Sequence, residues 1–167
     1  DVDRDVASGC NEIVIAPSNT QRLYMAWNGR VYRSENRGTT WTRTAFSQVA
    51  TNPATDNPAK NFGPYLAVDP INADIVFYGP PSADAWVSID AGANWTQITV
   101  FATPTVPAGA TVGGGTLFKI DPSSTTSGGR KQGIYASVYG TGVYHTTDAG
   151  ANWTLTLGEP STDIEWN

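Results

Sequence analysis

The sequence predicts an all-β fold, a β-propeller of four-stranded antiparallel blades, on three observations. An eight-residue pattern, Ser/Thr-x-Asp/Asn-x-Gly-x-x-Trp, occurs three times, its glycines lying 54 residues (38 to 92) and then 58 residues (92 to 150) apart. Short pieces rich in β-branched and aromatic residues, which are typical of strands, flank each copy in the same order. No segment shows the periodicity of a helix. A repeat of this length that holds four strands has the size of one propeller blade.

Each repeat divides into four expected strands. The first ends at a proline, because proline cannot donate a hydrogen bond to a neighbouring strand. The third leads into the eight-residue pattern, called the octet below, and the fourth follows its tryptophan. The expected strands are 13–17, 23–25, 31–32 and 42–46; 66–70, 75–78, 86–87 and 96–100; and 117–122, 134–135, 143–144 and 154–157. The corresponding blades of one propeller segment, 1–167, are 11–46, 63–101 and 115–157.

The octet lies where the third strand must reverse into the fourth, and its residue types suit a turn. An Asp or Asn side chain can bond to nearby backbone N–H groups, glycine permits a positive φ, and the tryptophan buries a large ring. We therefore interpret these positions as structural. They are Ser34, Asn36, Gly38 and Trp41; Ser88, Asp90, Gly92 and Trp95; and Thr146, Asp148, Gly150 and Trp153.

Composition narrows the classes of function. Hydrophobic residues make up 40% and charged residues 15% of the chain, which indicates a globular rather than a disordered protein. A net charge of -5 without basic runs argues against nucleic-acid and anionic-membrane partners. No apolar stretch approaches the ~20 residues of a membrane span. Cys10 is the single cysteine and His145 the single histidine, so we expect no disulfide, metal or cofactor.

Three blades are too few to close a ring, and an open ring leaves strand edges bare. The first expectation is that the chain is part of a larger wheel whose remaining blades lie elsewhere. The alternative is that identical chains assemble into a complete wheel as a homo-oligomer.

In a propeller the loops between second and third strands, and those between blades, gather at one end, where binding usually takes place. Trp27, Asn28 and Tyr139 fall there, and aromatic rings can stack on the C–H face of a sugar. Asp56 and Asp84 are the carboxylates expected at this end. The other interpretation stays open: the rings pack against neighbouring blades, and the carboxylates are ordinary surface charges.

The octets resemble the Asp-box (BNR) repeat of sialidases, sortilin-type receptors, photosystem assembly factors and the xyloglucan-cleaving endoglucanases of glycoside hydrolase family 74. The stretch 63–72, followed by 75–79 and 86–88, is most similar to the N-terminal propeller of family 74. The resemblance implies a carbohydrate-active propeller segment that supplies a binding face for xyloglucan or another β-glucan polysaccharide.

In that family the catalytic aspartates lie on other blades, so no catalytic residue is assigned here and activity of this chain stays open. The resemblance also implies an extracellular or periplasmic location. The alternative function is a non-catalytic propeller scaffold for protein–protein interaction.

Overall fold

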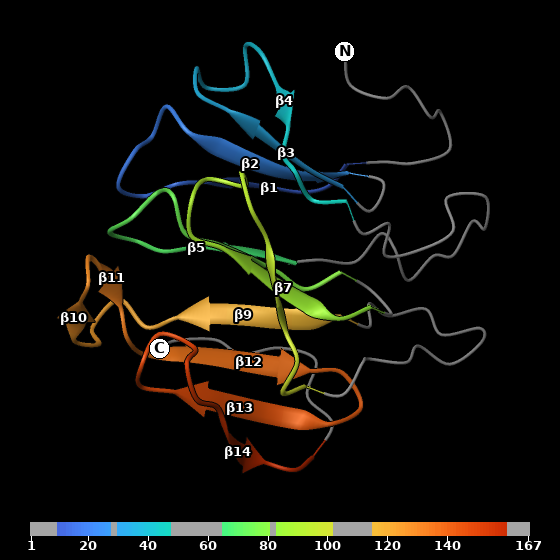
Figure 1. Ribbon diagram of the computed structural model, residues 1–167, viewed down its shortest axis with the longest axis vertical. Coiled ribbons are helices and arrows are strands. Elements are labelled where there is room, and N and C mark those ends of the chain that lie inside the picture. The colour runs from blue at the N-terminus through green and yellow to red at the C-terminus, as the bar shows by residue number, and fades with distance from the viewer. Residues whose placement is uncertain (1–9, 28–29, 48–64, 81–82, 102–114, 160–167) are drawn as a thin grey trace.

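A computed structural model describes residues 10–27, 30–47, 65–80, 83–101 and 115–159. Within these ranges every regular element is a β-strand and none is a helix. Most of the strands form three four-stranded antiparallel sheets, and in each sheet the strands lie side by side in chain order. The predicted all-β architecture is confirmed (Figure 1).

The three sheets are built alike. The first contains β1 (Cys10–Ile15), β2 (Leu23–Trp27), β3 (Arg30–Ser34) and β4 (Thr42–Arg43). The second contains β5 (Leu66–Val68), β6 (Val76–Tyr78), β7 (Ala85–Ser88) and β8 (Thr96–Ile98). The third contains β9 (Thr116–Ile120), β12 (Ile134–Val138), β13 (Gly142–Thr146) and β14 (Thr154–Leu157).

The first two fourth strands are shorter than predicted. β4 ends at Arg43 rather than at 46, and β8 ends at Ile98 rather than at 100. The reason is visible after β4, where the N–H of Ala45 donates to the carbonyl of Gly92, 2.9 Å away in the next sheet. The chain thus leaves its own sheet and crosses to the neighbour.

A small hairpin was not predicted. β10 (Thr126–Ser127) and β11 (Arg130–Lys131) project between β9 and β12. Gly128 and Gly129 form its two-residue turn with φ of 58° and 72°, the double positive φ that favours glycine. The N–H of Lys131 donates to Asp69 Oδ2 at 2.8 Å, so the hairpin is fixed to the second sheet.

The sheets stack face to face with their first strands side by side, β1 against β5 and β5 against β9 (Figure 1). An apolar cluster fills each of the two seams. The first holds Tyr24, Ala26, Val31, Phe46, Tyr65, Leu66, Val76 and Tyr78. The second holds Ile75, Phe77, Ala85, Phe101, Phe118, Ile134, Ala136 and Val138.

Each seam is closed by a phenylalanine from the segment that leaves the preceding sheet. The ring of Phe46 lies 5.3 Å from that of Trp95 in an edge-on arrangement. Phe101 repeats this contact with Trp153 at 5.0 Å in the second seam. Truncating a buried ring of this kind costs about 3–5 kcal/mol, so these two residues hold the sheets together.

Candidate functional site

The two ends of the sheets differ in what they carry. At one end, the loop end, the second strand of each sheet leads into the third, beside the pairs Trp27–Arg30, Tyr78–Trp86 and Val138–Gly142. At the other end, the octet end, the third strand leads into the octet. In Figure 1, β12 points toward the loop end, and β9 points toward the octet end.

The octets form three equivalent turns that are held by their own side chains. In each, a hydroxyl oxygen accepts the N–H of the octet glycine, at 2.8 Å for Ser34 and Ser88 and 3.1 Å for Thr146. The side-chain Oδ1 of the third octet residue, Asn36, Asp90 or Asp148, accepts the N–H of the seventh at 2.8 Å. The turns are complete without a ligand.

The octet carboxylates are stabilised in their charged form. Hydrogen bonds from Thr146 and Asn152 lower the pKa of Asp148 to about 2. Hydrogen bonds from Asn94 likewise lower the pKa of Asp90. A carboxylate held ionised by local donors is a poor proton carrier at neutral pH, which is consistent with a structural role.

The two aromatic residues proposed to contact sugar lie at the loop end, on different sheets. Trp27 ends β2 and is half-buried, and its ring lies 6.1 Å from that of Tyr32. Tyr139 follows β12, is half-buried, and its N–H donates to the carbonyl of Gly115 at 3.2 Å. The contact with Tyr32 supports the packing interpretation for part of the Trp27 ring, and the sugar-binding role of both residues stays a prediction.

The proposed polar residues are less well placed for catalysis. Asp84 precedes β7, and its Oδ2 accepts a hydrogen bond from Gln97 Nε2 at 2.6 Å. Asn28 and Asp56 lie outside the described residues. The structure therefore brings Trp27, Asp84 and Tyr139 to the same end but distributes them over three sheets.

The second and third sheets meet at the loop end through bare backbone. A Cβ placed on Gly79 would lie 1.8 Å from the carbonyl oxygen of Thr116, and one on Gly115 would lie 2.3 Å from that of Gly79. Any side chain at these positions would collide with main chain that cannot rotate away. The two glycines thus fix how closely the second and third sheets, which carry Asp84 and Tyr139, approach each other at the loop end.

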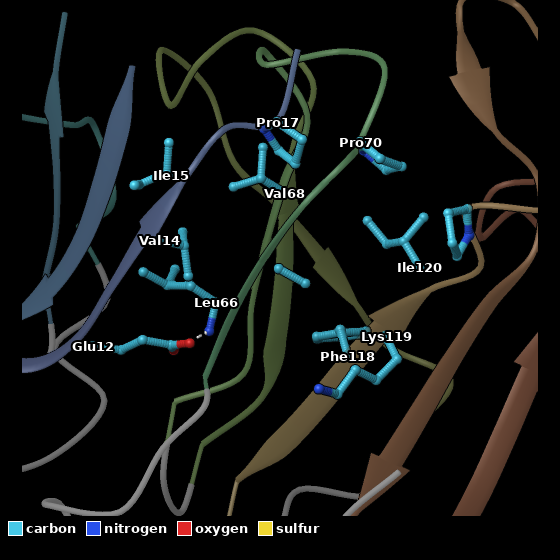
Figure 2. A pocket seen from close by; sticks show the side chains of 12 residues that line it. Glu12, Val14, Ile15, Pro17, Leu66, Val68, Pro70, Phe118, Lys119 and Ile120 are labelled. Atoms are coloured by element: carbon cyan, nitrogen blue, oxygen red, sulfur yellow. Dashed lines mark hydrogen bonds between the residues drawn. The ribbon is translucent and has the colours of Figure 1, made fainter. Parts of the chain in front are cut away.

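The first strands of the three sheets also line an open groove of about 440 Å³ (Figure 2). Its walls are apolar, and three prolines, Pro17, Pro70 and Pro122, stand at the octet end where the predicted first strands terminate. Glu12 and Lys119 are the charged residues that line it. In a wheel this groove would form part of the wall of the central channel.

Glu12 connects the first two sheets at the loop-end part of this groove. Its carboxylate accepts the N–H of Leu66 at 2.6 Å (Figure 2). It also accepts the N–H of Tyr65. Burial raises the pKa of Glu12, while these two donors and the charge of Lys119 act in the opposite direction. The carboxylate therefore accepts hydrogen bonds from the edge of β5 that, within the described residues, pairs with no other strand.

Sequence reasoning did not find Glu12. The available signal was a carboxylate inside a strand-like run, Cys10-Asn11-Glu12-Ile13-Val14-Ile15, because a charged residue in such a run is rarely buried without a partner. What the sequence could not give was the partner, since Tyr65 and Leu66 are more than fifty positions away.

Two kinds of feature are absent from the described residues. In those ranges no three side chains of His, Cys, Asp or Glu come together in a way that could hold a metal ion. The same part of the chain contains no helix long and apolar enough to cross a membrane.

No family model matches the sequence. Over 175 residues the chain is 33% identical to a xyloglucanase from a Paenibacillus species, a match that covers 92% of this chain and 17% of the relative. It is 30% identical to a xyloglucanase of Hypocrea jecorina, covering 91% of this chain and 20% of that protein. The chain thus spans about a fifth of the length of these relatives.

Solved structures that are similar to this chain also belong to xyloglucanases and related enzymes. A glycoside hydrolase family 74 xyloglucanase from Xanthomonas campestris superimposes with a TM-score of 0.71 at 26% identity, over 91% of this chain and 24% of that one. A family 74 enzyme from Niastella koreensis gives 0.73 at 29% identity, over 91% and 23%. The homologues of this chain are therefore family 74 xyloglucanases, and the predicted propeller fold and family resemblance are confirmed.

Proposed function

We propose that this chain, as a segment similar to part of a family 74 xyloglucanase, supplies a binding face for a xyloglucan or related β-glucan chain at the loop end of its sheets. The observation that carries the proposal is the likeness to xyloglucanases along more than nine-tenths of the chain. The half-buried rings of Trp27 and Tyr139 at the loop end support it, because a sugar stacks on an exposed aromatic face.

The proposal assigns binding but not bond cleavage to this chain. Glycoside hydrolysis requires two carboxyl groups about 5–9.5 Å apart on either side of the bond. At the loop end, Asp84 is bonded to Gln97, and Glu12 is bonded to two backbone amides on another sheet. Among the described residues we therefore assign no catalytic pair, and we propose that the pair lies on blades outside this chain. Because a polysaccharide does not cross a membrane, the proposal also places the protein outside the cytoplasm, in the extracellular space or the periplasm.

Affinity electrophoresis in gels that contain xyloglucan or a mixed-linkage β-glucan tests the binding face. We expect the wild-type chain to be retarded, and Trp27→Ala to lose most of the retardation while its circular dichroism spectrum is unchanged. Trp41→Ala is the matched control, because it removes a half-buried tryptophan at the octet end and should leave the retardation intact.

Normal migration of the wild-type chain in both gels would reject polysaccharide binding and favour the scaffold alternative, which a pull-down from the source organism would then address. Equal retardation of wild type and Trp27→Ala would remove Trp27 from the binding face while keeping the function.

A further inference from the structure

Two of the three octets end in a triplet with chemistry of its own. The seventh octet residue and the residue after the tryptophan are Asn94 and Thr96 in the second octet, and Asn152 and Thr154 in the third. With tryptophan between them, these are the only Asn-x-Ser/Thr triplets in the sequence. Such a triplet is the acceptor for N-linked oligosaccharide. The first octet has Thr40 at its seventh position and therefore lacks the triplet.

The first octet also shows that the turn does not require asparagine at this position. The N–H of Thr40 donates to Asn36 Oδ1 at 2.8 Å, the same distance as the corresponding bond in the other two octets. Asn36 Nδ2 in turn donates to the Thr40 hydroxyl at 2.9 Å. Because a hydroxyl can donate as well as accept, threonine could also pair with Asp90 or Asp148. The geometry of the turn alone therefore does not account for the two asparagines.

The acceptor groups are open to solvent. Asn94 and Thr96 are exposed although the second sheet has a neighbouring sheet on each side, so their exposure does not depend on where the chain begins or ends. Between them Trp95 is half-buried, and its ring contacts Phe46 in the seam. Asn152 and Thr154 repeat the exposed pair in the third octet. Each triplet thus presents its amide and its hydroxyl while its middle residue is held by packing.

The octet can keep its hydrogen bonds when this amide carries a sugar. Asn94 Nδ2 donates to Asp90 Oδ2 at 2.7 Å, and Asn152 Nδ2 donates to Asp148 Oδ2 at 2.8 Å. A carboxamide nitrogen has two hydrogens, and each of these bonds uses one. A glycosylated amide retains one N–H, so it can still donate to the carboxylate.

We propose that Asn94 and Asn152 are N-glycosylation sites, so that the octet end of the second and third sheets carries oligosaccharide. The amide nitrogen forms a bond to C1 of an oligosaccharide that is carried on a lipid diphosphate. The bond between C1 and the diphosphate oxygen breaks, the lipid diphosphate leaves, and the amide loses one proton. The inference rests on the export from the cytoplasm that the proposed function implies, because this modification belongs to exported proteins.

The two sites lie at the end of the sheets that the proposed function does not use. The second octet follows β7 and the third follows β13, both at the octet end. Trp27 and Tyr139 lie at the loop end. Oligosaccharide on the octets would therefore leave the proposed polysaccharide-binding face open.

Mass spectrometry of proteolytic peptides from the protein secreted by its source organism tests the proposal. We expect the peptides with Asn94 and Asn152 to carry oligosaccharide, and we expect peptide N-glycosidase to release it and convert each asparagine to aspartate. Unmodified Asn94 and Asn152 in the secreted protein would overturn the proposal. Modification of one site alone would overturn the assignment of the other.

Export of the chain through the secretory pathway of yeast tests the argument from geometry. Thr96→Ala should remove the glycan of the second octet, because it deletes the acceptor hydroxyl and leaves the hydrogen bonds of Asn94 in place. Thr42→Ala is the matched control, since it makes the same change in the octet without the triplet and should leave glycosylation unchanged. Thr40→Asn completes the triplet there and should add one glycan.

The number of glycans is counted as steps in gel mobility that peptide N-glycosidase reverses. It is counted in the cell extract as well as in the medium, so that a variant that folds poorly still gives a result. Thr40→Asn without an added glycan, or Thr96→Ala with an unchanged number, would contradict the role given to these octet positions.

Retardation by xyloglucan, measured before and after enzymatic release of the glycans, separates this inference from the proposed function. We expect equal retardation, because the sites lie at the opposite end from the binding face. An unglycosylated protein that is retarded would overturn this inference alone. A glycosylated protein that is not retarded would reject the polysaccharide-binding face alone.

Discussion

The first octet and the other two make the same turn, but the hydrogen bond between their third and seventh side chains runs in opposite directions. In the first, Asn36 Nδ2 donates to the hydroxyl of Thr40 at 2.9 Å. In the second, the direction is reversed, and Asp90 Oδ2 accepts from Asn94 Nδ2 at 2.7 Å. Asp148 and Asn152 repeat the reversed pair in the third at 2.8 Å. The turn therefore requires a matched donor and acceptor at its third and seventh positions but does not require a charge.

The same comparison extends to the tryptophans. Trp95 and Trp153 each contact a phenylalanine that arrives from the preceding sheet. Trp41 lies over Gly38 of its own octet, as Trp153 lies over Gly150, but among the described residues Trp41 makes no contact with another aromatic ring. The octet is thus a self-sufficient turn, and the tryptophans of the second and third octets also contribute to the seams with the preceding sheets.

The largest expected effect tests this difference between the tryptophans. Trp95→Ala should lower the free energy of unfolding by about 3–5 kcal/mol, because it opens a cavity against Phe46. Trp41→Ala should cost clearly less. Chemical denaturation followed by circular dichroism measures both, and equal losses would show that the ring stabilises its own turn rather than the seam.

An intermediate effect follows from the octet charges. The pKa of Asp148 is about 2 in the folded chain and that of Asp90 is also lowered, so their contribution to stability is present above the ordinary Asp value and lost as pH falls toward 2. The double variant Asp90→Asn with Asp148→Asn should show a weaker loss of thermal midpoint between pH 4 and pH 2. Asn36→Asp should show a stronger loss. Parallel curves for all three proteins would contradict a role for these charges.

The smallest effect has the opposite sign and comes from Glu12. Burial raises its pKa, so its contribution to stability is present below the ordinary Glu value and decreases as pH rises through the raised one. Glu12→Gln keeps an oxygen that can accept from Tyr65 and Leu66 but cannot ionise. Its thermal midpoint should therefore fall less than that of the wild type as pH rises above about 4.5. An identical pH dependence would show that burial does not disfavour the ionised form of Glu12.

How much could be read from the sequence depended on how local the determinant is. The octet bonds join residues at most four positions apart, so the residue types of Ser34, Asn36 and Gly38 were sufficient to predict a turn. The strand pieces followed from composition in the same way. The early departure of Phe46 from its sheet was not predictable, because the acceptor for Ala45 is Gly92, in another repeat.

The candidate site was less accessible for two reasons. Glu12 is defined by partners on β5 that no local pattern connects to it. The sugar-binding residues depend on side-chain orientation at loop ends, where Trp27 had two interpretations that sequence alone cannot separate. Part of its ring contacts Tyr32, and the electrophoresis experiment decides what the rest of it does.

The glycine pair at the loop end has a mechanical consequence. Main chain contacts main chain between Gly79 and Thr116. No side chain therefore lies between the second and third sheets at this point. A methyl group added to residue 79 would push the two sheets apart at this contact and tilt one against the other. The displacement would extend to the loops at the loop end that carry Tyr139 and Asp84. The distance between the two sheets at this seam is therefore set by backbone atoms alone, and it is kept only while residue 79 has no side chain.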